Sequence, residues 1–132
     1  MDKQSLEGSN VVKNMIFDSE LKVLEILWDR GDMTAKDVAT ELHKSTAWSR
    51  TTSYTIIRKC VNKGLIERLE PNFICRAMVT REEAQKQELD ILRDRMFNGS
   101  SDLLIASLLG GSKMTTSQID GLRKMVEAYG AE

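Results

Sequence analysis

Residues 47–64 read AWSRTTSYTIIRKCVNKG and carry the side chains best suited to contact a polyanion. The stretch contains hydroxyl groups, arginines and lysines but no Asp or Glu. Apolar or small residues recur at the spacing of one helix face. This predicted inner face consists of Ser53, Ile56, Ile57, Cys60 and Val61. The opposite face consists of Thr51, Tyr54, Thr55, Arg58, Lys59 and Asn62. Because a solvated helix commonly pairs Glu with Lys, an outer face without carboxylates indicates a surface for nucleic acid.

The position of each polar residue along this helix predicts its role on DNA. The N-terminal half of a recognition helix enters the major groove, where a guanidinium can bind guanine and a threonine methyl can contact thymine. The candidates for base contacts are Thr51, Tyr54, Thr55 and Arg58. The candidates for phosphate contacts, which position the protein without reading bases, are Ser49, Arg50, Lys59 and Lys63. Trp48 is either a core or hinge aromatic or a phosphate contact through its indole N–H.

Few residues in the sequence indicate catalysis, cofactor binding or metal binding. His43 is the only histidine, and the sequence has no Ser-His-Asp set, phosphate-binding glycine loop or Cys/His cluster with metal-ligand spacing. We therefore predict that the protein is not an enzyme and uses no cofactor and no metal. Cys60 and Cys75 are predicted to be reduced, buried thiols, with a redox switch or a metal ligand as the alternative.

Charge along the 132-residue chain is uneven, although the net charge is only −1. Residues 1–29 carry three Lys or Arg against six Asp or Glu, residues 30–81 carry ten against five, and residues 82–132 carry six against nine. A basic middle between acidic ends predicts that the middle contacts the polyanion. No apolar run approaches the roughly 20 residues that span a bilayer, so we predict a cytoplasmic protein without membrane insertion.

The elements around the recognition helix predict a winged helix-turn-helix over residues 15–80, after a flexible lead-in over residues 1–14. A helix is expected from Asp18, with its carboxylate as N-cap, to Gly31. A short helix follows Thr34, an N-cap with Asp37 three residues later. After Gly64, the runs LIERL and FICRAMV flank EPN and predict a two-stranded hairpin with its turn at Pro71 and Asn72. This wing offers Arg68 and Arg76 for minor-groove or backbone contacts.

The C-terminal part, residues 81–132, predicts a helical dimerisation domain. Capping-box pairs at Thr80 with Glu83 and at Thr115 with Gln118 start two helices, and DLLIASLL forms a short apolar helix between NGSS and GGS. Helices this short and apolar need a partner to bury them, and a second copy would also supply a second recognition helix. The predicted dimerisation residues are Leu103, Leu104, Ile105, Leu108, Leu109, Ile119, Leu122, Met125 and Val126. The alternative is that these helices fold back onto their own winged domain.

Three stretches together resemble the penicillinase and methicillin-resistance repressor family (BlaI/MecI). They are FDSELKVLEILWDRGDMTAKDVATEL, WSRTTSYTIIRKCVNKGLIER and VTREEA. The resemblance implies a mostly α-helical chain with a small β wing, which acts as a dimeric repressor of promoters with short inverted repeats. It also implies that Thr52, Thr55 and either Arg58 or Lys59 lie on the DNA-contact helix. Tyr54 departs from the family pattern, where an Arg is frequent nearby.

The resemblance further implies derepression through a membrane-sensor and protease pathway that cuts an Asn-Phe bond in the short dimerisation helix. The matching place reads IASLL, so Ser107 and Leu108 are the candidate cleavage position, without an Asn-Phe pair. Either another bond is cut or the trigger differs. Two other functions stay open from the sequence: a winged-helix protein-interaction module without an operator, and a DNA-binding regulator that responds to a small molecule.

Overall fold

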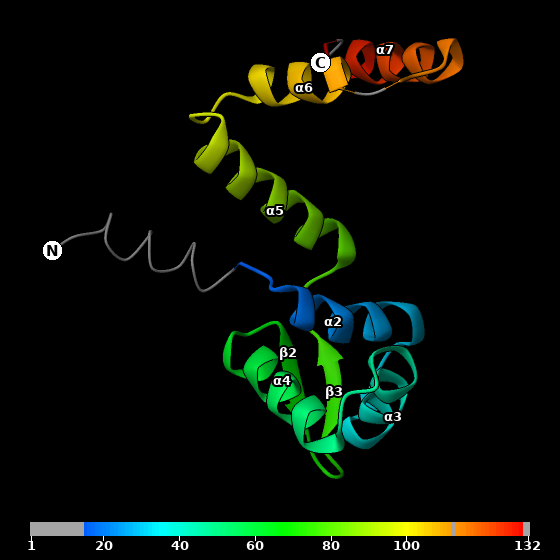
Figure 1. The fold of residues 1–132 in the computed structure, drawn as a ribbon, viewed down its shortest axis with the longest axis vertical. Helices are drawn as coiled ribbons and strands as arrows, with labels where there is room; N and C mark the ends of the chain where they lie inside the picture. Colours follow the sequence, from blue (N-terminus) through cyan, green and yellow to red (C-terminus); the bar gives the residue numbers. More distant parts are fainter. Residues whose placement is uncertain (1–14, 112, 131–132) are drawn as a thin grey trace, which may run out of the picture. The chain divides into compact units, whose positions relative to one another are not determined.

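The computed structural model describes residues 15–111 and 113–130, and the predicted lead-in over residues 1–14 lies outside them. The chain divides into two compact units, one up to Ile91 and one from Leu92. This division falls inside helix α5, Arg81–Met96, which is later in the chain than the boundary predicted at residue 80. Figure 1 shows the elements of both units.

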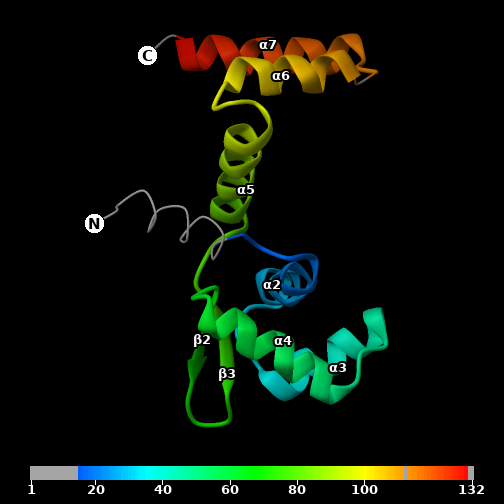
Figure 2. The same ribbon diagram turned by 60° about the vertical axis from the view of Figure 1, so that its left-hand side comes forward.

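The first unit begins with three helices and a small sheet, as the winged helix-turn-helix prediction requires, and ends within α5. The helices are α2 (Asp18–Arg30), α3 (Ala35–Thr46) and α4 (Arg50–Asn62). The strands are β1 (Met33–Thr34), β2 (Ile66–Leu69) and β3 (Ile74–Ala77). In Figures 1 and 2 the β2–β3 hairpin runs beside α4. The fold class predicted from the sequence is therefore confirmed.

Helix α2 starts differently from the prediction. Asp18 is its first residue and not its N-cap, because Phe17 occupies the cap position in an extended conformation. The backbone N–H of Phe17 donates to Oε1 of Glu20 at 2.9 Å, so the carboxylate that serves the helix start is Glu20. The predicted end is confirmed: the N–H of Gly31, at φ +82°, donates to the carbonyl of Leu27.

Side-chain oxygens cap the next two helices. Thr34 accepts a hydrogen bond from the N–H of Asp37 at 3.1 Å, as predicted. At the start of α4, the hydroxyl of Ser49 accepts a hydrogen bond from the N–H of Thr52, also at 3.1 Å. Such caps satisfy backbone donors that have no partner within the helix. They place the beginning of α4 at Arg50, within the stretch predicted to be the recognition helix.

The wing contains one strand more than predicted. β2 and β3 pair antiparallel with Arg68 opposite Cys75, and the turn contains Asn72 at φ +72°. β1 adds on the other side of β3, which gives the order β1–β3–β2. A strand of two residues leaves no alternating pattern to read, so only pairing with β3 identifies it.

The core of the first unit lies between the three helices and the sheet. Its fully buried side chains include Leu24, Leu42, Ile57, Ile66 and Cys75. Burial of each aliphatic side chain stabilises the fold by roughly 2 kcal/mol. The inner face predicted for α4 is largely confirmed: Ser53, Ile57 and Cys60 are fully buried, and Ile56 and Val61 pack half-buried at the edge of the core.

The second unit contains the end of α5, α6 (Ser101–Gly111) and α7 (Thr116–Gly130). Thr80 with Glu83, and Thr115 with Gln118, form the predicted capping boxes, each with both hydrogen bonds present. The expected break at GGS is partly wrong, because α6 continues through Gly110 and Gly111. Figures 1 and 2 both show α6 and α7 side by side.

Candidate nucleic-acid interface

The exposed face of α4 is cationic and hydroxyl-rich. Its exposed side chains are Thr51, Thr52, Thr55, Arg58, Lys59 and Asn62, with Ser49 and Arg50 exposed at the start of the helix. Over residues 15–111 and 113–130, no ion pair involves Arg50, Arg58 or Lys59. These three charges are consequently available to an external anion. The positive end of the α4 macrodipole adds to the potential beside Arg50.

The threonine side chains of α4 have defined local partners. The hydroxyl of Thr55 donates to the carbonyl of Thr51 at 3.0 Å, which leaves its methyl group and its oxygen lone pairs free. The Thr52 hydroxyl accepts from Ser49 Oγ at 3.1 Å. The helix therefore presents rigid methyl groups and hydrogen-bond acceptors, which suit thymine methyls and base amino groups.

Tyr54 lies between the predicted outer face and the core. Its ring is half-buried and meets the ring of Phe73 in the wing edge to face, with centroids 6.3 Å apart. The wing packs beside α4, so one side of Tyr54 faces the hairpin. Sequence reasoning singled out Tyr54 but missed Phe73. An aromatic residue directly after the Pro-Asn turn was the available signal for it.

Lys63 does not belong to the exposed cationic face. Its Nζ lies 2.6 Å from Oε1 of Glu20 and also donates to the backbone carbonyl of Met15. Its ammonium lies 4.2 Å from the ring centroid of Phe17, and its side chain is only 16% exposed. Because these contacts occupy the ammonium group, we leave Lys63 out of the proposed interface.

The two wing arginines are exposed but paired. Arg76 binds Oδ2 of Asp32 through Nε and Nη2, at 3.0 and 2.8 Å, and this carboxylate raises the pKa of Arg76. Arg68 donates from Nε to Oε1 of Glu70 at 2.8 Å. Because both ion pairs are exposed to solvent and therefore weak, a phosphate could replace either carboxylate.

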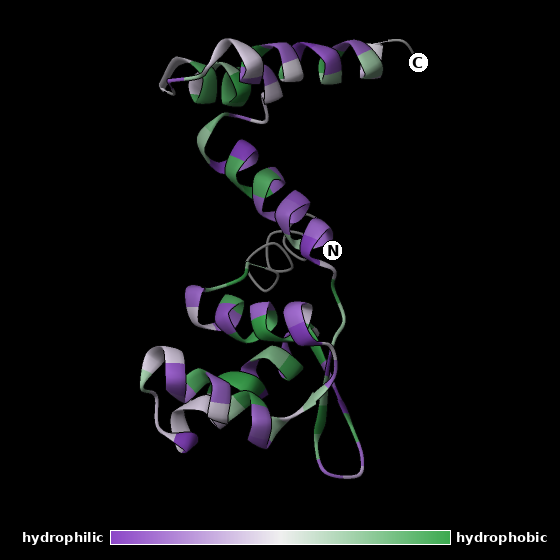
Figure 3. Ribbon diagram, turned by 90° about the vertical axis from the view of Figure 1, so that its right-hand side faces the viewer, coloured by the Kyte–Doolittle hydropathy of each residue, from purple (hydrophilic) through white to green (hydrophobic). Residues whose placement is uncertain are grey.

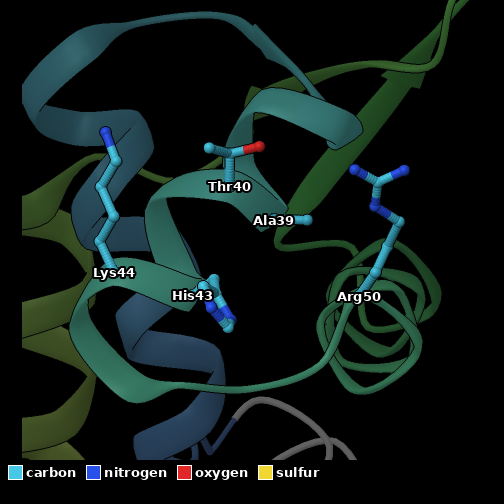
Figure 4. A pocket seen from close by; sticks show the side chains of 5 residues that line it. All are labelled: Ala39, Thr40, His43, Lys44 and Arg50. Atoms are coloured by element: carbon cyan, nitrogen blue, oxygen red, sulfur yellow. The ribbon is translucent and has the colours of Figure 1, made fainter.

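The turn between α3 and α4 is held by His43 and Trp48. Nδ1 of His43 donates to the carbonyl of Trp48 at 3.0 Å, and Trp48 packs half-buried against the core, as its hinge interpretation predicts. A shallow hollow beside this turn is lined by Ala39, Thr40, His43, Lys44 and Arg50. In Figure 4, Lys44 and Arg50 lie on opposite sides of His43, so these polar groups do not converge on one point. The hollow gives little support to a small-molecule site.

Cys60 and Cys75 are both fully buried, and both are free thiols without a disulfide bond. Burial, reinforced by the carboxylate of Glu20, raises the pKa of Cys60 to about 12, and burial raises the pKa of Cys75 to about 11. Both thiols are therefore protonated near neutral pH. Within the described part of the chain, no three His, Cys, Asp or Glu residues are grouped closely enough to hold a metal ion.

The second unit exposes apolar side chains along α6 and α7. Figure 3 shows hydrophobic colouring over much of α6. Of the predicted dimerisation residues, eight are exposed: Leu103, Ile105, Leu108, Leu109, Ile119, Leu122, Met125 and Val126. Leu104 is half-buried. It lines an open hollow with Leu92, Met96, Phe97, Ser107 and Leu108.

Three helices followed by a hairpin wing, with a cationic exposed face on α4, are the features of the winged helix-turn-helix class. A model of the penicillinase repressor family matches residues 16–128. The chain belongs to this family of transcriptional repressors.

Individual relatives are distant but similar over most of their length. The penicillinase repressor of Bacillus licheniformis is 21% identical over 116 residues, which cover 86% of this chain and 91% of the relative. The methicillin resistance regulatory protein MecI of Staphylococcus aureus is 21% identical over 113 residues, 84% of this chain and 92% of the relative. The solution structure of the DNA-binding domain of the repressor BlaI covers 53% of this chain and 88% of that domain, at 24% identity and a TM-score of 0.49.

No helix in the described ranges is long and apolar enough to cross a membrane.

Proposed function

We propose that the protein is a dimeric repressor that recognises an inverted-repeat operator in double-stranded DNA. The observation that carries this proposal is the exposed face of α4, where Arg50, Arg58 and Lys59 have no carboxylate partner among the described residues. A solvated helix in a protein of this composition would place acidic residues among such cations. DNA supplies the missing negative charge.

Within this proposal the α4 residues divide by role. Arg58 and the threonines Thr51 and Thr55 contact base edges in the major groove, because they project from the exposed face of the helix. Arg50 and Lys59 bind phosphates on either side, together with Ser49 and Thr52 at the helix start. Arg68 and Arg76 add wing contacts once a phosphate replaces their exposed carboxylate partners.

A homodimer follows from the second unit. Five Leu or Ile residues of α6 and α7 are 44–57% exposed. Apolar side chains grouped at a surface are typical of an interaction site. A second copy would bury both surfaces through a two-fold axis. The same axis would place two α4 helices at half-sites about one DNA turn apart.

Release of the DNA would follow from damage to this dimer. Ser107 and Leu108 lie inside α6, and Leu108 is 57% exposed. Hydrolysis near them, by a protease within a membrane-sensor pathway, would divide the proposed interface and favour monomers. Another signal that separates the two copies would have the same effect. By analogy with the relatives named for penicillinase and methicillin resistance, we propose a cytoplasmic regulator of antibiotic-resistance genes.

The first experiment measures DNA preference by fluorescence anisotropy. One duplex is the promoter region upstream of the protein's own gene, a second is its shuffled sequence, and a third is selected by the protein from random-sequence DNA. Each is titrated at three salt concentrations, because the affinity depends strongly on salt. We expect at least about a hundredfold preference for a specific duplex and two chains per site. Equal, weak binding to all three duplexes would contradict the proposal and favour a protein-interaction module.

Two variants separate base reading from phosphate binding. Arg58→Ala should weaken binding to the specific duplex about tenfold or more and leave binding to shuffled DNA less affected. Arg50→Ala should weaken both duplexes similarly and lower the salt dependence by about one phosphate contact. Arg30→Ala, which removes an exposed charge from α2, is the control and should change neither. A selective effect of Arg30→Ala would refute the assignment to α4.

A further inference from the structure

Two cations and two aromatic rings form a continuous row of contacts from the exposed face of α4 to the wing. The guanidinium carbon of Arg58 lies 5.9 Å from the ring centroid of Tyr54. Tyr54 meets Phe73 at 6.3 Å with an interplanar angle of 61°, and the guanidinium carbon of Arg68 lies 3.9 Å from the Phe73 centroid. Both cation–ring and edge-to-face ring contacts are attractive. We call these four residues the arginine–aromatic ladder.

Phe73 is the most constrained member of the ladder. Its φ of +50° is uncommon for a bulky residue. Its carbonyl accepts a hydrogen bond from the N–H of Ala35 at 2.9 Å, which ties the wing turn to the start of α3. Its half-buried ring packs against the core as well as against Tyr54. The backbone contact to α3 and the ring contacts to α4 and β2 hold Phe73 in one place despite the cost of its backbone conformation.

The ends of the ladder remain accessible to DNA. Arg58 is exposed and free of ion pairs in the described ranges, and the side chain of Arg68 is 50% exposed. Glu70, the partner of Arg68, is 61% exposed, so their ion pair is weak and exchangeable. The ring of Phe73 would keep the guanidinium of Arg68 in position while its nitrogens change from Glu70 to a phosphate.

We propose that Tyr54 and Phe73 are positioning residues that set the place of Arg58 and Arg68 on the DNA. The ladder makes the recognition helix and the wing a single contact unit, so that Phe73 contributes to DNA affinity through Arg68. This inference rests on the proposed function, because it needs a specific duplex on which the affinity is measured.

The test is a double-mutant cycle on the full chain with the selected duplex. Phe73→Leu should weaken binding about two- to fivefold, as expected for a lost cation–π contact at an exposed site. It should also lower the salt dependence by about one phosphate, the same change as Arg68→Gln causes. The double variant should bind like Arg68→Gln alone, because Phe73 acts through that guanidinium. Phe73→Tyr keeps the ring and should restore wild-type affinity and salt dependence.

A matched control is Phe17→Leu, which also removes a ring that carries a cation, the ammonium of Lys63. This change should leave the salt dependence as it is in the wild type. The inference is wrong if Phe73→Leu leaves affinity and salt dependence unchanged, or if its effect multiplies with that of Arg68→Gln. Should Phe73→Leu lose its thermal unfolding transition, Tyr54→Leu decides: this variant removes the ring beside Arg58, and unchanged affinity for the specific duplex overturns the inference.

The outcomes for the wild type distinguish the two proposals. A wild-type chain that selects no sequence overturns the proposed function, and the ladder inference is overturned with it. If the wild-type chain selects a duplex but the effects of Phe73→Leu and Arg68→Gln on binding are additive, the proposed function stands. Only the ladder inference is then overturned.

Discussion

Glu20 and Lys63 show how a single contact changes the role inferred for a residue. The carboxylate of Glu20 is 1% exposed and bonds both the ammonium of Lys63 and the N–H of Phe17. A buried ion pair gives little net stability compared with apolar residues, but removing one partner leaves an uncompensated charge. Lys63 thus joins the end of α4 to the start of α2, and its charge serves the fold.

Lys63→Met is expected to destabilise the protein by about 3 kcal/mol, because the carboxylate of Glu20 loses its counter-ion. Urea unfolding measures this change. Lys59→Met, the same substitution at an exposed position of α4, should cost under about 0.5 kcal/mol. Glu20→Gln combined with Lys63→Met should recover part of the loss. If Lys63→Met instead reduced the salt dependence of DNA binding and spared stability, Lys63 would be a phosphate contact.

The buried thiol of Cys60 links stability to alkaline pH. Its pKa is raised from the ordinary value of 9.0 to about 12, so the folded protein favours the protonated thiol. The resulting stability is fully present below pH 9 and is lost as the pH rises from 9 towards 12. The slope reaches at most about 1.4 kcal/mol per pH unit. Free energies of unfolding at pH 7, 9 and 10 should therefore fall more steeply for the wild type than for Cys60→Ala. Parallel curves would contradict this linkage.

At the scale of elements, capping interactions decide where helices begin. The Thr80–Glu83 box has both of its hydrogen bonds, at 2.9 and 3.0 Å, and it starts α5 directly after the sheet. Helix α5 buries only Ala84, so packing contributes little to its first turn. Its start therefore depends more on the cap than the start of α3 does, where Ala35, Val38 and Ala39 are all buried.

Thr80→Ala should cost about 1 kcal/mol, since the N–H of Glu83 loses its acceptor. Native-state hydrogen exchange is the direct measurement: the amide of Glu83 should lose protection, with the middle of α3 unaffected. Thr40→Ala is the matched control, because the Thr40 hydroxyl only donates back to the carbonyl of Lys36 in its own helix. Equal effects of the two variants on the Glu83 amide would rule out a capping role.

At the scale of the whole molecule, the two units have different surfaces. The first has a closed core, whereas none of the residues in α6 and α7 is buried in the isolated chain. Apolar helices without a buried face are stable when another copy covers them. Oligomeric state and DNA binding are therefore coupled in the proposed function.

Met125→Glu should weaken the proposed dimer at least about tenfold, because it places a charge among the apolar side chains of α7. Lys124→Glu, at the neighbouring polar position of the same helix, is the control and should leave the dimer intact. Sedimentation velocity over a concentration series measures both. The Met125→Glu chain should also lose preference for a two-half-site duplex over a single half-site. A wild type that sediments as a monomer at all concentrations would refute the dimer.

Features that depend on neighbouring residues could be predicted from the amino-acid sequence. Caps at Thr34, Thr80 and Thr115, the end of α2 at Gly31 and the turn at Asn72 follow from local backbone chemistry, and all are present. Helical periodicity likewise predicted the buried and exposed faces of α4, because the 3.6-residue period of an α-helix does not depend on the tertiary packing around it.

The contacts of the charged and aromatic residues at the edges of these faces could not be predicted, because they depend on tertiary packing. Lys63 pairs with a carboxylate 43 residues earlier and Arg76 with one 44 residues earlier, and Tyr54 packs against Phe73 across the wing. Strand β1 exists only through its pairing with β3. Sequence patterns describe which direction a side chain points from its own helix or strand. Which partner it meets depends on how distant segments pack, and no local spacing encodes that.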